Sequence, residues 1–148
     1  MQPSALQLER AFFRRIDITA QLDAGAVPPQ TIEAGVTSGR AADNPLRYQV
    51  TLVVRLPDVV GKTNGYRGEV EIIGQFSIAE SVPEPERDRT VAVVGSSLLY
   101  GMVREMIANL TARGPWPMVV LPTVTFNDLV IKRDEGSPSL PVAQDRSK

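Results

Sequence analysis

The stretch SSLLYGMVREMIANLTARGPWPMVVLPTVTFNDL, residues 96–129, decides the fold because it holds a helix, its end and an extended return. Its apolar side chains recur at helical spacing, at Leu99, Met102, Val103, Met106, Ile107 and Leu110. Ser96 or Ser97 can cap this helix, and Gly114 with Pro115 ends it. The stretch therefore predicts one long amphipathic helix, which must cover an apolar surface formed elsewhere in the chain.

The chain before this helix has the alternating pattern of strands. Polar and apolar residues alternate over residues 12–22, 48–56 and 66–79, and more weakly over 31–37. In the first of these strands we expect one face to carry Phe12, Arg14, Ile16 and Ile18, and the other Phe13, Arg15, Asp17 and Thr19.

Turn-forming residues separate these strands. Asn64 and Gly65 favour a hairpin between the last two strands, and Gly74 suggests a bulge in the second of them. Residues 38–45 and the Pro-rich, charged residues 81–89 are predicted to be loops.

Strands first and helices last predict an α+β fold. We expect a four-stranded antiparallel sheet with a long helix and a short C-terminal helix, over residues 127–133, packed on one face. On this reasoning we expect residues 1–133 to form a single domain, and residues 134–148, rich in Ser, Pro and charge, a disordered tail.

The composition excludes several classes of function. The 148 residues contain no Cys and no His, so neither a Ser-His nor a Cys-His nucleophile pair is available, and metal ligands are scarce. We expect no enzyme activity, no cofactor and no metal. A net charge of −1 gives no reason to expect nucleic-acid binding. We find no signal peptide and no uncharged run long enough to insert into a membrane, and expect a cytoplasmic protein.

Four segments, in order, resemble the SecB family of protein-export chaperones. Residues 15–19 (RIDIT), 48–52 (YQVTL) and 69–78 (EVEIIGQFSI) resemble three strands of that family, and the stretch from residue 96 to 129 its C-terminal half. The resemblance covers about residues 10–130. It implies an ATP-independent holdase that binds unfolded preproteins and assembles as a dimer of dimers.

The resemblance also implies an apolar groove for unfolded clients. The matching residues are Phe12, Tyr100, Met102, Met106, Trp116, Val119, Leu121 and Phe126. Met and aromatic side chains suit promiscuous binding because they adapt to many apolar partners. The same residues would equally serve an ordinary core or a subunit interface. We expect Trp116 to line the groove near Phe126 and the strand that carries Phe12; its burial as a core residue is the alternative.

Members of the family dock the translocase motor ATPase SecA through acidic residues on the outer sheet face. Asp17 and Glu69 match two such positions, although a solvated strand face would explain them as well. Gln21 stands where the family usually has Glu, and Arg67 where it has an apolar residue, so both positions depart from the docking pattern. SecB-like relatives that guard an antitoxin are the alternative, so a module dedicated to one partner remains open.

We also expect a homo-oligomer. Leu98, Leu99, Met102, Val103, Met106, Ile107 and Leu110 make an apolar stripe too wide for one small sheet to cover. The expected contacts use the long helix and the edge of the sheet.

Overall fold

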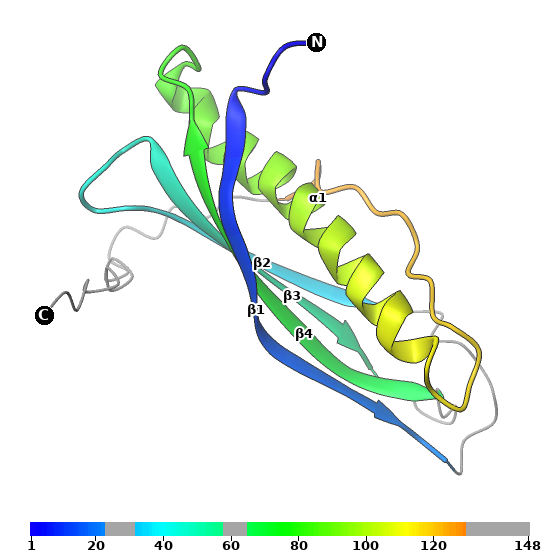
Figure 1. Cartoon of the computed structure of the whole chain (residues 1–148). Helices are drawn as coiled ribbons and strands as arrows, with labels where there is room; N and C mark the ends of the chain where they lie inside the picture. Colours follow the sequence, from blue (N-terminus) through cyan, green and yellow to red (C-terminus); the bar gives the residue numbers. More distant parts are fainter. Residues whose placement is uncertain (23–31, 58–64, 130–148) are drawn as a thin grey trace, which may run out of the picture.

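The structure is a computed structural model that describes residues 1–22, 32–57 and 65–129. Its elements are the strands β1 (Leu6–Ala20), β2 (Glu33–Arg40), β3 (Arg47–Leu56) and β4 (Tyr66–Ile78), followed by the helix α1 (Glu84–Thr111). The strands form one antiparallel sheet in the order β1-β4-β3-β2, and α1 lies across one face of it (Figure 1). The predicted α+β fold with a four-stranded sheet and a long helix is confirmed.

Some predicted features have different bounds or fall elsewhere. The short C-terminal helix is not shown: residues 127 and 128 form a turn, and 130–133 lie outside the described residues. Most of the predicted hairpin connection and the whole predicted tail also lie outside them. Strand β2 starts two residues later than predicted and continues to Arg40, so the expected loop after it is shorter.

The core lies between the sheet and α1. Along β3 and β4, every second residue points toward α1 and is buried, as the alternation predicts. Helix α1 contributes to the core the side chains on its sheet-facing side. The largest fully buried side chains include Leu52, Leu56, Ile72, Phe76, Leu99, Ile107 and Leu121.

Gly74 allows α1 to approach the sheet closely. A Cβ at Gly74 would lie 2.6 Å from Cε2 of Phe76 and 2.9 Å from a methyl group of Leu99. On the helix side, a Cβ at Gly95 would lie 3.3 Å from the same ring. The aromatic ring of Phe76 thus occupies space that two glycines leave open. The expected bulge at Gly74 is wrong, because the irregularities of this strand pair lie in β1.

Strand β1 begins at Leu6, six residues before the predicted start, and changes register twice against β4. One shift lies between Leu8 and Arg10 and the other between Phe13 and Arg15. Each shift moves the following side chains to the other face of the sheet. The predicted common face is therefore wrong: Phe12 pairs with Ile73 on the outer face, whereas Ile16 pairs with Val70 on the helix face.

Helix α1 begins at Glu84, inside the segment that we expected to be a loop. Pro85 lies in the first turn, where its missing N–H costs no hydrogen bond, and the acidic side chains of Glu84 and Glu86 favour a helix N-terminus. The predicted caps are wrong as well. Ser96 is buried in mid-helix, and the Ser97 hydroxyl donates to the carbonyl of Val93 at 2.8 Å.

At 28 residues, α1 also contains an 18-residue window with a mean hydropathy of 1.4, so length and composition alone would let it cross a membrane. Packing inside the protein accounts for part of this apolar content, since 44% of the window is buried.

After α1 the chain turns at Gly114 and runs back along the helix as an extended segment (Figure 1). We call residues 117–129 the strap. Its main chain is fastened to α1 from Thr111 at one end to Arg89 at the other. The long helix therefore has one flank covered by the strap and the other directed toward β1.

Candidate client-binding surface

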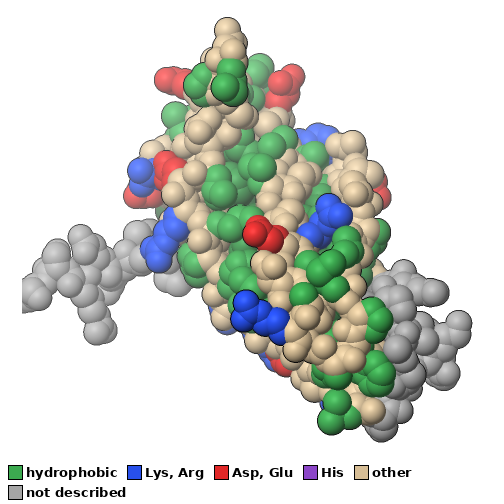
Figure 2. Space-filling model, turned by 45° about the vertical axis from the view of Figure 1, so that its right-hand side comes forward, with side chains coloured by type: hydrophobic (Ala, Val, Ile, Leu, Met, Phe, Trp, Pro, Cys, Tyr) green, Lys and Arg blue, Asp and Glu red, His purple; other side chains and the backbone are tan. Residues whose placement is uncertain are grey.

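An apolar ridge winds along α1, and its C-terminal end faces β1. It consists of side chains four residues apart, each next to the one before it on the helix surface, at Val94, Leu98, Met102, Met106 and Leu110. Leu98 and Leu110 remain 45% and 39% exposed, and Ile16 of β1 remains 44% exposed. A space-filling view that includes α1 shows apolar side chains spread over the surface, with few charges between them (Figure 2).

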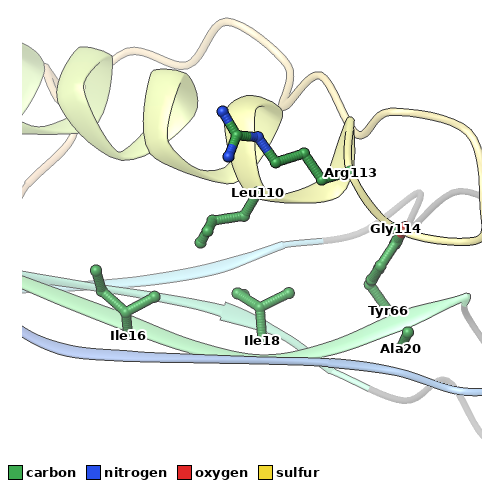
Figure 3. Close-up of a pocket in the computed structure, with 7 residues that line it drawn as sticks. All are labelled: Ile16, Ile18, Ala20, Tyr66, Leu110, Arg113 and Gly114. Carbon is green, nitrogen blue, oxygen red and sulfur yellow. The ribbon is translucent and has the colours of Figure 1, made fainter.

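At its C-terminal end the ridge borders a groove of about 300 Å³. The groove is lined by Ile16, Ile18, Ala20, Tyr66, Leu110, Arg113 and Gly114. Figure 3 shows Leu110 projecting from α1 toward Ile16 and Ile18 on the strand below, with Arg113 at the end of the helix. We did not expect Ile16, Ile18 and Arg113 to form part of a site. The two isoleucines could have been found only with the correct register of β1.

The residues predicted to bind clients fall into three groups. Tyr100, Val119, Leu121 and Phe126 are buried between α1, the sheet and the strap. Met102, Met106 and Trp116 are half-buried, and the two methionines belong to the ridge. Phe12 lies apart from all of them on the outer face, beneath the guanidinium of Arg10 at 5.2 Å. The structure does not gather these eight residues into one groove.

The buried group joins the strap to the helix. The rings of Tyr100 and Phe126 meet edge to face with centroids 5.8 Å apart, and the Tyr100 hydroxyl donates to the carbonyl of Pro122 at 2.6 Å. Burial raises the pKa of Tyr100, so it keeps its proton and remains a donor. These four residues therefore act first as core.

Trp116 packs between the end of α1 and the sheet. Its indole N–H donates to the carbonyl of Gln21 at 3.0 Å, and its ring packs on Gly65, where a Cβ would lie 2.9 Å from Cδ1. Its own main-chain N–H donates to the hydroxyl of Tyr66 at 3.3 Å. The prediction that Trp116 lies near Phe126 is wrong. Phe126 packs on Tyr100, whereas Trp116 follows the end of α1 at Thr111. The 11 residues from Tyr100 to Thr111 alone span about 16 Å of helix. Binding of clients by the indole stays a prediction.

Asp17 and Glu69 lie directly opposite each other on the outer face, as Cα partners of β1 and β4. Neither carboxylate is isolated. Glu69 pairs with Arg55 at 2.8 Å and with Arg15 at 3.9 Å, and Arg15 also reaches Asp17 at 3.4 Å. The hydrogen bond that Arg55 donates to Glu69 raises the pKa of Arg55. The arginines balance the two acids, so this part of the face is not an acidic patch.

A polar cluster that the sequence did not reveal ties β2 and β3 to the start of α1. Arg40 pairs with Asp88 at 2.8 Å and with Glu84 at 3.2 Å, and the Tyr48 hydroxyl donates to Asp88 at 2.8 Å. Burial, followed by the hydrogen bond to Asp88, raises the pKa of Tyr48 to about 12. Burial by itself would lower the pKa of Arg40, but its bonds to Asp88 and Glu84 raise it. No sequence signal pairs residues some 48 positions apart, so only the fold brings these groups together.

The family model described as preprotein translocase subunit SecB matches residues 13–136. The chain belongs to the SecB family. Among relatives, it is 29% identical over 111 residues to the protein-export protein SecB of Anaplasma marginale (strain Florida), covering 75% of this chain and 60% of that protein. It is 28% identical over 120 residues to the SecB of Anaplasma phagocytophilum (strain HZ), covering 80% and 72%.

The fold also occurs among solved structures. One example is the Mycobacterium tuberculosis Rv1957 SecB-like chaperone in complex with a ChAD peptide from the Rv1956 HigA1 antitoxin. The match has a TM-score of 0.54 at 18% identity and covers 82% of this chain and 91% of that one. The family suggested by the sequence is thus confirmed, and the neighbour shows the same architecture.

Proposed function

We propose that this chain is a holdase chaperone that binds unfolded preproteins without nucleotide and keeps them competent for export. One observation carries the proposal: the ridge on α1 and the facing isoleucines of β1 leave large apolar side chains in solvent around a groove. Contiguous apolar surface of this kind is a usual mark of a binding site. Met102 and Met106 in the ridge adapt their shape to many partners. Membership of the SecB family supports the same function.

The same ridge can hold a second copy of the chain, and we propose a homo-oligomer, built as a dimer of dimers, whose contacts use α1 and the edge strand β1. Placing a charge on a ridge residue, and on an exposed residue elsewhere as a control, tests whether the ridge serves these roles. Leu98→Asp places a charge on the ridge rather than in the core, because this side chain is already 45% exposed. Val120→Asp is the matched control, since Val120 is exposed on the strap and away from the ridge.

The proposal is tested by suppression of aggregation. Several unrelated unfolded proteins are mixed with the chain at stoichiometric ratios, without ATP, and light scattering is followed. The wild-type protein and Val120→Asp should suppress scattering of most clients, and Leu98→Asp should suppress it poorly. Sedimentation of the same variants reports the oligomer. Lack of suppression by the wild-type protein would refute the holdase, and a stable monomer at micromolar concentration would refute the oligomer.

A second candidate is a SecB-like chaperone dedicated to one partner, such as an antitoxin. The observation in its favour is the pairing of Asp17 and Glu69 with arginines, which balances the charge on the face where the family docks SecA. A solved neighbour of the same fold carries an antitoxin peptide. Protection of a single partner, rather than of many clients, would favour this candidate.

Motor docking through Asp17 and Glu69 is tested by releasing them from their arginines. The double variant Arg15→Gln, Arg55→Gln frees both carboxylates and should bind SecA more tightly than the wild-type chain at low salt. Replacing Asp17 and Glu69 by Lys should abolish whatever binding exists. Equal binding by all three proteins would remove these residues from any docking role.

A further inference from the structure

The strap is held to α1 in the way that a bound peptide is held. Four helix side chains form hydrogen bonds with its main chain: Thr111 accepts from the N–H of Val119 at 2.9 Å, Arg104 donates to the carbonyl of Leu121 at 3.0 Å, Tyr100 donates to Pro122, and Arg89 donates to Asn127 and Leu129. We call these four residues the α1 ladder. Because these bonds are made to backbone atoms, they do not depend on which side chains the extended segment carries.

The side chains of the strap alternate as those of an extended ligand do. Val119 and Leu121 point inward and are buried, whereas Met118 and Val120 point outward and are 52% and 62% exposed. Phe126, further along the strap, also points inward and packs against the ring of Tyr100. Main-chain bonds with pockets for alternate side chains are the features by which proteins bind extended peptides. The part of the strap from 117 to 126 has no regular secondary structure of its own to hold it in place.

We propose that the strap is an internal occupant of a second peptide channel, formed by the α1 ladder, and that an extended polypeptide with apolar residues two positions apart displaces it. This channel lies on the flank of α1 opposite the ridge, so it is distinct from the groove at Ile16 and Leu110. In the closed state the strap protects Val119, Leu121 and Phe126 from solvent, and in the open state the incoming chain replaces them one for one. The inference rests on the proposed function only in identifying the ligand as an unfolded chain.

The probe is a fluorescent synthetic peptide with the sequence of residues 117–129, PMVVLPTVTFNDL, and binding is followed by anisotropy. Leu121→Ala in the full-length protein weakens the internal strap but leaves the ladder intact. When an internal competitor occupies a site, the apparent affinity falls with the fraction of open sites, so we expect this variant to bind the peptide about tenfold more tightly than wild type. Val120→Ala is the matched control and should leave the affinity unchanged. A peptide with Ser in place of Val119, Leu121 and Phe126 should not bind.

The unmodified protein gives a second measurement, which also decides the matter if Leu121→Ala fails to fold. Saturating peptide should speed hydrogen exchange at the amide of Val119, which donates to Thr111 in the closed state, while leaving the amides of β3 unchanged. Unchanged or slower exchange in the strap, or equal peptide affinity of Leu121→Ala and Val120→Ala, would overturn the proposal. Displacement of the strap without suppression of aggregation would refute the holdase alone. Suppression with a strap that never moves would refute the channel alone.

Discussion

The two faces of the sheet are made by the same four strands, yet they differ in almost every physical respect. The helix face carries Val50, Leu52, Ile72 and Phe76, all without solvent contact. The outer face carries charged residues joined in pairs, among them Arg14 with Glu71 at 2.9 Å and Arg55 with Glu69. Burial of apolar surface stabilises a fold strongly, whereas exposed ion pairs contribute little. The helix face therefore sets stability, and the outer face is free to serve recognition.

Two phenylalanines on opposite faces give the strongest test of this difference. Phe76 is fully buried beneath α1, whereas Phe12 is 37% exposed on the outer face. We expect Phe76→Ala to lower the free energy of unfolding by about 3–5 kcal/mol and Phe12→Ala by less than about 1 kcal/mol, because only the first leaves a cavity. Urea denaturation of both variants checks this. Similar losses at the two positions would contradict the assignment of faces that follows from the bulges in β1.

Two glycines extend the comparison to added volume. A Cβ at Gly74 would meet Phe76 and Leu99, whereas a Cβ at Gly35, opposite Val53 on the outer face, meets no atom within 4 Å. Gly74→Ala should cost about 1–3 kcal/mol, since overpacking forces side chains or α1 to move. Gly35→Ala should be neutral or slightly stabilising. Thermal melts of the two variants measure this. If Gly74→Ala left the stability unchanged, α1 would lie less tightly on the sheet than described.

The polar cluster at Tyr48 predicts how stability depends on pH. The pKa of Tyr48 is about 12 in the folded protein and about 10 in an unfolded chain, so above pH 10 the unfolded chain alone releases this proton. The stability that the protonated Tyr48 contributes is complete below about pH 10 and is lost as the pH rises to about 12. The free energy of unfolding should fall by about 1–2 kcal/mol over this range after screening. Tyr48→Phe should show a smaller alkaline loss than wild type in urea titrations from pH 8 to 12. Parallel curves for the two proteins would remove Tyr48 from this role.

The smallest effect is expected on the outer face. Replacing both Asp17 and Glu69 by Lys breaks ion pairs whose arginines are more than half exposed, and should shift Tm by no more than about 3 °C. Differential scanning calorimetry measures this directly. A loss as large as that of Phe76→Ala would show that the outer face contributes to stability as the helix face does.

The parts of the fold that could be predicted from the sequence are those governed by local periodicity. Strands β3 and β4 are buried on the face that carries their apolar residues, as the alternation over residues 48–56 and 66–79 predicts. The same method failed in β1, where two register shifts against β4 reverse the faces. The start of α1 was missed because Pro83 and Pro85 resemble loop residues, although proline is well tolerated in the first turn of a helix.

The candidate site divides in the same way. The resemblance to SecB, together with helical spacing, points to Met102 and Met106, and together with the polar phase of two strands it points to Asp17 and Glu69. The register of β1 places Ile16 and Ile18 in the groove. The same register places Phe12, which was predicted to line a groove, on the outer face. The contacts of Arg40 and of Trp116 connect residues too distant in the chain for any local pattern to pair them.

By itself the sequence determined the fold class, the family and the long amphipathic helix, because alternation, helical spacing and the order of motifs are properties of neighbouring residues. Only the tertiary structure decided which flank of α1 remains open to solvent, and that the strap covers the other. It also decided that arginines balance Asp17 and Glu69. These outcomes depend on which distant segments lie side by side, and that is settled by strand register and close packing over the whole chain rather than by any single stretch of it.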